Sequence, residues 1–305
     1  MRLTRRGLFG ASAAGGLLAA GTFTASAETM DRARVTRHDL ALPHWPAELA
    51  LTLAVIADLH ACEPWMNEER VTGIVEQTNA LGADAVVLLG DYVVGHGLGM
   101  TRIPEQAWAR PLGRLSARLG VHAVLGNHDW WADEAVQRSR SGLPQAARAL
   151  EEAGIPVLHN RAVRLSVAGA RLWLAGLGDQ EAFNRSSEPA ERFGGVDDLP
   201  GTLAQVPENA SVILLAHEPD VFPHVPDRVS LTLSGHTHGG QVKAFGYAPL
   251  IPSRYGSRYL HGHVEEDGRH LVVSGGLGCS VLPLRWGCPP EILLLSLSGT
   301  ESPAA

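Results

Sequence analysis

Short apolar runs alternate with amphipathic stretches along most of the chain. The runs have the length and the Val, Leu and Ala content of buried strands, and they cover residues 51–57, 85–89, 121–125, 211–216, 229–233, 271–273 and 292–295. Between the early runs, apolar residues recur at helical spacing over 67–81, 105–119 and 143–153, and a glycine follows each stretch. The pattern predicts an α/β fold in which strands and helices alternate.

The middle of the chain has a different character. Residues 162–167 and 171–175 predict a pair of strands, and the polar segment 181–202 predicts a surface loop with a short helix. Neither an internal repeat nor a linker is visible, so a lead-in over 28–50 and one domain over 51–298 are expected. Parallel units followed by antiparallel strands predict two packed sheets flanked by helices.

The first 27 residues have the layout of a cleavable signal peptide. Basic residues precede a soft apolar run over 8–20, and Ala25-Ser26-Ala27 supplies small residues for cleavage. The pair Arg5-Arg6 resembles the twin-arginine export signal. We therefore expect the twin-arginine export machinery as a partner and a location in the periplasm, cell wall or extracellular space. Retention of the segment as an uncleaved anchor stays open.

Composition excludes several classes of protein. Of 305 residues, 45% are hydrophobic and 19% are charged, which is typical of a globular protein and not of a disordered one. The net charge is -7, so no nucleic-acid scaffold binding is expected. Three cysteines are too few for a disulfide scaffold. Cys279 and Cys288 form either a disulfide or two free thiols, and the sequence leaves both open.

Polar residues follow five of the predicted strands at the point where each strand ends. These strings are Asp58-Leu59-His60, Gly90-Asp91, Gly126-Asn127-His128-Asp129, His217-Glu218 and Gly235-His236-Thr237-His238. Ligands of open α/β sheets gather beyond the carboxyl ends of strands. Each string alone is typical of a turn or a cap, but the ordered set of five predicts a single site.

The same ordered set resembles the calcineurin-like metallophosphoesterases, and the resemblance covers residues 51–296. The strings over 88–93, 217–220, 235–241 and 285–291 are similar to the YkuE/YaeI-type phosphodiesterase branch of that family. The resemblance implies a metallo-dependent phosphatase-like fold, which is a four-layer α/β/β/α sandwich of two mixed sheets flanked by helices.

The resemblance also implies two divalent metal ions and their ligands. One ion would be held by Asp58, His60 and His238, the other by Asn127, His217 and His236, with Asp91 bridging the two. A hydroxide between two such ions is a nucleophile for in-line attack on phosphorus. The ligands offer oxygen and nitrogen but no thiolate, which favours Mn, Fe or Zn without choosing among them. His128 is the implied catalytic residue, a general acid or charge stabiliser, and Asp129 is a candidate for orienting it.

The implied activity is that of an exported, metal-dependent phosphodiesterase acting on a small phosphate ester or a lipid-linked phosphate. The string Gly-Asp-x-x-Asp-Arg-Gly of the related protein phosphatases is absent at 90–96, which argues against a phosphoprotein substrate. Two alternatives stay open. One is a pyrophosphate hydrolase of the UDP-2,3-diacylglucosamine type, from lipid A-like envelope metabolism, and the other is a non-catalytic metal-binding envelope protein. Peripheral membrane contact also stays open.

Overall fold

The computed structural model describes residues 28–95, 97–167, 169–183 and 194–300. The predicted signal peptide, residues 1–27, lies outside them. The strands are β1 (Arg34–Leu42), β2 (Leu51–Ile56), β3 (Cys62–Glu63), β4 (Ala85–Leu88), β5 (Thr101–Arg102), β6 (Val121–Ala123), β7 (Arg161–Leu165), β8 (Leu172–Gly176), β9 (Ser211–Leu215), β10 (Leu231–Ser234), β11 (Gly262–Glu266), β12 (Arg269–Val273) and β13 (Glu291–Gly299).

The α-helices are α2 (Glu68–Asn79), α3 (Glu105–Leu112), α4 (Asn127–Trp131), α5 (Glu134–Ser139), α6 (Gln145–Glu152) and α7 (Leu199–Ala204). Short 3-10 helices are η2 (Pro219–His224), η3 (His238–Gly240) and η4 (Gly256–Tyr259). None of the described helices is long and apolar enough to cross a membrane.

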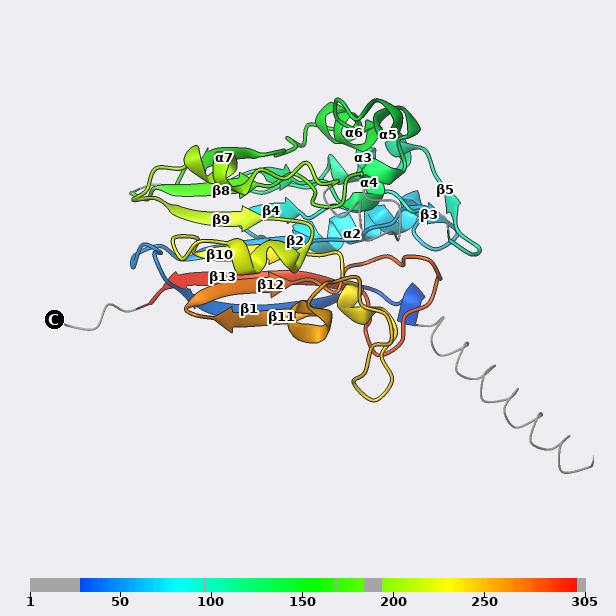
Figure 1. Cartoon of the computed structure of the whole chain (residues 1–305). Coiled ribbons are helices and arrows are strands. Elements are labelled where there is room, and N and C mark those ends of the chain that lie inside the picture. Colours follow the sequence, from blue (N-terminus) through cyan, green and yellow to red (C-terminus); the bar gives the residue numbers. More distant parts are fainter. Residues whose placement is uncertain (1–27, 96, 168, 184–193, 301–305) are drawn as a thin grey trace, which may run out of the picture.

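Two mixed sheets form the centre of the molecule (Figure 1). The five-stranded sheet has the order β1-β13-β2-β4-β6, and the six-stranded sheet has the order β11-β12-β10-β9-β8-β7. Strands β2, β4 and β6 are parallel to one another, as are β8, β9, β10 and β12. The carboxyl ends of these parallel strands therefore lie at one edge of each sheet, where the predicted site residues follow.

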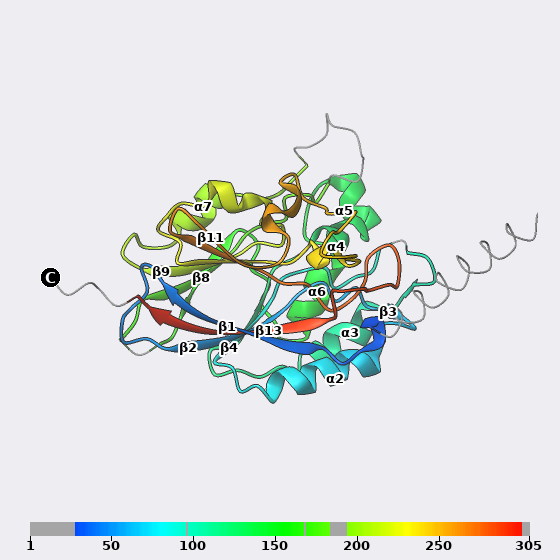
Figure 2. The same ribbon diagram turned by 90° about the horizontal axis from the view of Figure 1, so that it is seen from below.

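Three apolar layers hold the sheets and helices together. One lies between the five-stranded sheet and α2, α3 and α6, the second between the two sheets, and the third between the six-stranded sheet and α7 with η2. In β2, Leu53 and Val55 pack against the second sheet, whereas Ala54 and Ile56 pack against the helices, as the two-residue period of a strand requires. Figure 2 shows α2 and α3 outside one sheet and α7 outside the other. The predicted four-layer sandwich is confirmed.

Several elements differ from the sequence prediction: strands β3, β5 and β11 and helix α5 are not predicted, and two further differences have a clear cause. The segment 28–50, for which no element is predicted, contains β1, and all nine residues of β1 pair with β13 in parallel. Helix α3 ends at Leu112 instead of near residue 119. The reason is local: Pro111 has no N–H to continue the helical hydrogen bonds, and Gly113 follows it as the C-cap.

The cysteines settle one alternative that the sequence leaves open. Cys62, Cys279 and Cys288 are all buried and free, so the two-thiol alternative is correct and Cys279 and Cys288 do not form a disulfide. Burial raises the pKa of each of these thiols. A buried thiol with a raised pKa is a packing group and not a reactive one.

Candidate metal centre

The polar strings beyond the strand ends converge at one place. Asp58 follows β2, Asp91 follows β4, and Asn127 begins α4 with three residues between it and the end of β6, so the five-stranded sheet supplies all three. The six-stranded sheet supplies His217 after β9 and His236 after β10. The seven predicted ligands thus come from both sheets, and all of them are buried.

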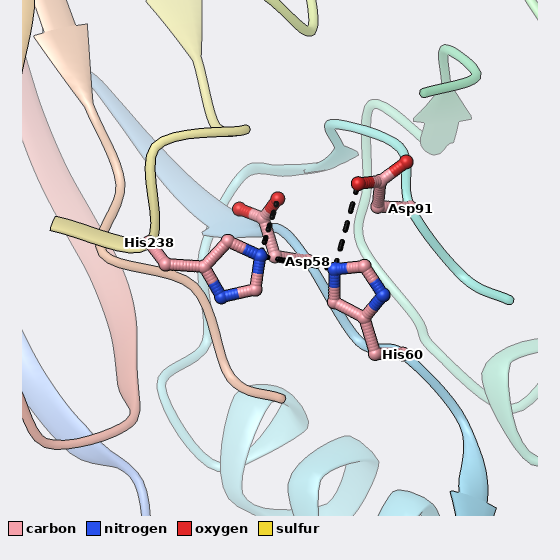
Figure 3. A group of neighbouring side chains, drawn as sticks. All are labelled: Asp58, His60, Asp91 and His238. Atoms are coloured by element: carbon pink, nitrogen blue, oxygen red, sulfur yellow. Dashed lines mark hydrogen bonds and ion pairs between the residues drawn. The ribbon is translucent and has the colours of Figure 1, made fainter. Parts of the chain in front are cut away.

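One group of side chains consists of Asp58, His60, Asp91 and His238 (Figure 3). His60 Nε2 lies 3.0 Å from His238 Nε2 and 3.4 Å from Asp91 Oδ2. His238 Nε2 lies 3.7 Å from Asp58 Oδ1. The candidate ligand atoms of the four residues all fall within 4.8 Å of one another, which is the spacing that one bound cation needs.

A second group shares Asp91 with the first and adds Asn127, His217 and His236. His217 Nε2 lies 3.3 Å from Asp91 Oδ2 and 3.2 Å from Asn127 Oδ1. His236 Nδ1 lies 3.0 Å from the same amide oxygen and 3.3 Å from His217 Nε2. Asp91 Oδ2 faces His60 of the first group and His217 of the second, so Asp91 occupies the position of a bridging carboxylate.

The donor set fits two divalent cations. Imidazole nitrogens and carboxylate or amide oxygens converge from several sides, as Mn, Fe and Zn sites require, and no thiolate takes part. Asp58 Oδ2 is buried without a hydrogen-bond partner among the described residues, although Asp58 Oδ1 accepts a hydrogen bond from His236 N at 2.9 Å. A buried carboxylate oxygen without a partner is costly unless a cation neutralises it.

The backbone at the site adopts an uncommon conformation. Five ligand residues have a positive φ: Asp58 (52°), His60 (46°), Asp91 (57°), His236 (68°) and His238 (52°). The left-handed region costs non-glycine residues about 1–3 kcal/mol each, and such conformations persist only where the surroundings hold them. Because the strained residues are proposed ligands, the surrounding structure holds the ligand backbone in place at a cost in stability.

Two glycines allow the ligands to approach their neighbours. A Cβ on Gly126 would lie 2.3 Å from Asp91 Oδ1, and a Cβ on Gly235 would lie 2.7 Å from Asp58 Oδ2. Both distances are shorter than any real contact of a Cβ atom. Each of these positions must therefore be glycine, because any side chain there would collide with the neighbouring carboxylate.

Hydrogen bonds outside the ligand set fix its orientation. His217 Nδ1–H donates to Leu89 O at 2.6 Å, which leaves Nε2 to face the other ligands. Asp129 accepts four backbone N–H bonds, from Asp91 and Gly126 to Oδ2 and from Tyr92 and Val93 to Oδ1. His128 Nε2 faces Ser280 Oγ, and His128 Nδ1 has no hydrogen-bond partner among the described residues. The orienting role considered for Asp129 is therefore wrong, and Asp129 links two of the strand-end loops instead.

Burial and close charges shift the pKa values of the ligands strongly. Burial raises the pKa of Asp58 to about 7, and it lowers those of His60 to about 3 and of His236 to about 4. Burial also disfavours the charged forms of His217 and Asp91, but the attraction between these two outweighs it. As a result, the pKa of His217 is well above the ordinary value for histidine, and the pKa of Asp91 is well below the ordinary value for aspartate. Without cations the centre thus holds protons that cations would displace.

His128 lies beside both groups without belonging to either. Its backbone N–H donates to Asp91 Oδ1 at 2.9 Å, and its ring meets His60 edge-on with centroids 4.8 Å apart. Nε2 reaches Ser280 Oγ at 3.5 Å, while Nδ1 has no partner among the described residues. Burial lowers the pKa of this imidazole, because the charged ring loses solvation.

Sequence reasoning missed two features of the centre. Arg285 is fully buried, donates from Nε to Gly278 O at 2.8 Å, and places Nη2 3.4 Å from His238 Nδ1. Asp179 follows β8, as a sixth string of the same kind, and is buried beside Glu218; burial and that neighbour raise its pKa well above the ordinary value. The signal for Asp179 was present in the sequence as Gly178-Asp179 after an apolar run.

A cavity of about 400 Å³ opens onto the centre. Five of the centre's residues line its floor: Asp91, Asn127, His128, His236 and His238. Its apolar wall is formed by Trp131, Val242, Pro249, Leu250, Ile251, Pro252, Val281 and Leu282. Glu181, whose pKa burial raises to about 7, and Gln241 also line it, and none of the described lining residues is a lysine or arginine. A ligand in this cavity meets polar groups at one end and hydrocarbon at the other.

Two ligand groups that share a carboxylate, set at the strand ends of a two-sheet α/β sandwich, define a dinuclear metal-dependent phosphoesterase. The chain belongs to the calcineurin-like phosphoesterase family, whose model matches residues 51–240. It is similar to the "Uncharacterized metallophosphoesterase YkuE" of Bacillus subtilis (strain 168), with 31% identity over 97% of this chain and 96% of that protein.

Two further similarities were found. The "Phosphodiesterase YaeI" of Escherichia coli (strain K12) is 30% identical over 70% of each chain. Among solved structures, that of a dimetal phosphatase from Danio rerio covers 74% of this chain and 88% of its own, with 16% identity and a TM-score of 0.40. The enzyme class and the dinuclear centre expected from the sequence are confirmed; the identity of the metal is not fixed by the donor set.

Proposed function

We propose that the chain is a phosphodiesterase that hydrolyses its substrate at the dinuclear centre. The observation that carries this proposal is the cavity lining. A phosphomonoester carries close to two negative charges near neutral pH, whereas a diester carries one. Among the residues that the structure describes, the lining offers no lysine or arginine for a second charge, and it includes the carboxyl group of Glu181. The name of the relative YaeI supports the same choice.

Two divalent cations, when bound, would polarise the phosphoryl oxygens and lower the pKa of a bound water. The chain supplies the rest of the chemistry. His128 lies on the cavity floor next to Asn127, where its N–H can donate to the phosphate or to the leaving oxygen. The apolar wall leaves one side of the cavity without polar groups that would hold water. An open cavity with His128 on its floor also favours an enzyme over a purely structural metal site.

The test compares the manganese-loaded protein on bis(4-nitrophenyl) phosphate and on 4-nitrophenyl phosphate. We expect the diester to have the higher kcat/KM, and we expect a chelator to abolish both activities. A clear preference for the monoester would refute the proposal while leaving the family membership intact. Zinc and iron are tested in parallel because the donor set accepts them.

A pyrophosphate-linked lipid of the UDP-2,3-diacylglucosamine type is the second candidate substrate, because the apolar wall suits an acyl chain. Such a substrate carries two negative charges on its pyrophosphate, which the lining does not neutralise. Release of the nucleoside monophosphate from the nucleotide-linked lipid, at a kcat/KM exceeding that for simple diesters, would favour this candidate over the first.

We also propose that the protein is exported by the twin-arginine route to the periplasm, cell wall or extracellular space. Support comes from Arg5-Arg6 and the apolar run that follows. Proteins on this route cross folded, so the metals can be loaded before export. Replacing both residues by lysine should leave active, uncleaved protein inside the cell, and normal export of that variant would exclude the route.

A further inference from the structure

Exposed apolar side chains gather around the mouth of the cavity. The loop over 241–255 carries Phe245, Tyr247 and Leu250, and the loop over 277–287 carries a second exposed set, Val281, Leu282 and Trp286. Figure 1 shows the loop between η3 and η4, in yellow to gold, extending beyond the sheets. We name these two loops, together with Leu98, the mouth rim. Leu250, Val281 and Leu282 also line the cavity, so the rim continues its apolar wall.

Hydrogen bonds make the mouth rim one unit. The Gln241 side chain donates to Ser280 O at 3.0 Å and accepts from Ser280 N at 2.7 Å. Lys243 N donates to Trp286 O at 2.7 Å, and Leu98 N donates to Val281 O at 3.0 Å. The exposed apolar side chains are therefore presented by loops that are fixed to one another.

The tip of the longer loop carries an aromatic side chain that folding does not explain. Ala244 and Tyr247 exchange two backbone hydrogen bonds of 2.9 Å around Phe245 and Gly246, whose φ angles are 53° and 82°. Such a turn favours Asn, Asp or Gly at both central positions. Phe245 is fully exposed there and in a conformation that is rare for a bulky residue. Phe245 gains no packing within the chain and strains its turn, which indicates that its ring contacts another molecule.

The charge of the mouth rim differs from that of the whole protein. The chain has 32 acidic residues, yet none lies within 241–264 or 277–290. Lys243, the only lysine of the chain, stands at the base of the loop that carries Phe245. Lys243 is half-buried, and Arg254 adds an exposed cation to the same loop, 3.8 Å from Asp220. Outside the loops, Asp220 pairs with Arg254 and Glu28 contacts Gly287, but the loops themselves carry cations and no carboxylate. Apolar loops of this charge are complementary to an anionic lipid surface.

The described chain also begins at this face. Thr29 Oγ1 donates to Pro283 O at 3.4 Å and accepts from Arg285 N at 2.9 Å, and Gly287 N donates to Glu28 Oε2 at 2.8 Å. The predicted signal segment, residues 1–27, joins the domain at this point. The first described residues are therefore hydrogen-bonded to the mouth rim.

We propose that the mouth rim docks on an anionic lipid bilayer and presents the cavity to phosphodiesters of that surface. The docking rests on the rim alone, whereas the substrate class rests on the phosphodiesterase activity proposed above. Phe245 and Tyr247 would enter the interfacial region, where aromatic rings are favoured. The apolar wall below them would receive the hydrocarbon part of a lipid as its phosphate reaches the metal centre.

The experiment measures flotation of the metal-loaded full chain with vesicles of phosphatidylglycerol and phosphatidylcholine, and with phosphatidylcholine vesicles alone. A double variant, Phe245→Ser with Tyr247→Ser, is compared with a matched control, Phe245→Leu with Tyr247→Leu. The wild type and both variants have the same N-terminus, so any difference in their vesicle binding is due to the side chains at positions 245 and 247. We expect binding to anionic vesicles to fall at least tenfold in the serine variant and less than threefold in the leucine variant.

Turnover of bis(4-nitrophenyl) phosphate in solution separates this proposal from the proposed function, because neither tip residue lines the cavity. Unchanged soluble turnover with lost hydrolysis of a fluorescent phospholipid in vesicles supports both parts of the proposal. Equal vesicle binding by wild type and serine variant refutes the docking. Binding without phospholipid hydrolysis refutes the substrate class. A wild-type dimer that the serine variant loses, without vesicle binding, shows instead that the rim joins two copies of the chain.

Discussion

Asp129→Asn tests whether the strand-end loops are held together as the structure indicates. The carboxylate accepts N–H bonds from Asp91 and Gly126 at one oxygen and from Tyr92 and Val93 at the other. An amide keeps one acceptor oxygen and turns an NH₂ group toward the remaining two donors. A buried N–H left without an acceptor costs about 1–3 kcal/mol, so two of them cost about 2–6 kcal/mol.

That loss is large but tolerable in a domain with about 5–15 kcal/mol of stability. The loops that lose their hydrogen bonds carry Asp91 and Asn127, which belong to the metal ligands. We therefore expect metal affinity to fall by about 10–100-fold, as is typical when a group that orients ligands is changed. Urea denaturation of the metal-free proteins measures the loss of unfolding free energy. Isothermal titration with manganese measures the loss of metal affinity.

Asp133→Asn is the matched control. Asp133 is also buried and accepts N–H bonds from Ala135, Val136 and Gln145, but it caps α5 outside the metal centre. Its amide variant should lose about 1–3 kcal/mol, for one unpaired N–H, and keep wild-type metal affinity. Equal metal affinity in both variants, or a loss below 1 kcal/mol in Asp129→Asn, would refute the reasoning.

Three further predictions concern the centre itself. Asp91→Ala should lose both metal ions and all activity while keeping its circular dichroism spectrum, and near-normal metal content by mass spectrometry would contradict the shared bridge. His128→Ala should keep both ions; its kcat/KM should fall by about 10²–10⁴ on alkyl diesters and less on nitrophenyl diesters, whose leaving group needs no proton. Equal losses on both would assign His128 to charge stabilisation instead. Because the pKa of Asp58 is about 7 and that of His217 is raised, protons on these groups compete with cations. Affinity should therefore rise from pH 5 to 7, up to about tenfold per pH unit for each proton released, and a flat profile in two buffers would contradict this.

Much of the fold was predictable because its main signals are local. Apolar runs bounded by turn residues identify the central strands, and the strings after them stand at the sheet edge whatever the details of packing. The motif around Asn127 follows its strand directly, and so does that around Asp91. The family resemblance then assigned the ligands to two groups, and the structure brings those same residues together.

The remaining features depend on contacts between distant parts of the chain. Strand β1 has mixed polarity because it is an edge strand with much of its surface exposed, and its partner β13 lies some 250 residues further along. Arg285 is adjacent to His238 in space but 47 positions away in sequence. Asp129 accepts hydrogen bonds from backbone N–H groups 36 to 38 positions earlier in the chain. The sequence instead suggested His128 as its partner, because the two residues are adjacent.

Both ligand groups draw on both sheets. Asp58, His60 and Asp91 extend from the five-stranded sheet, but the first group is complete only with His238 from the six-stranded sheet. In the second group the same Asp91 meets His217 across the interface between the sheets. Each cation would therefore hold the two sheets together at their common edge, where buried carboxylates and left-handed backbones otherwise oppose folding. Metal binding therefore stabilises the packing of the two sheets at this edge.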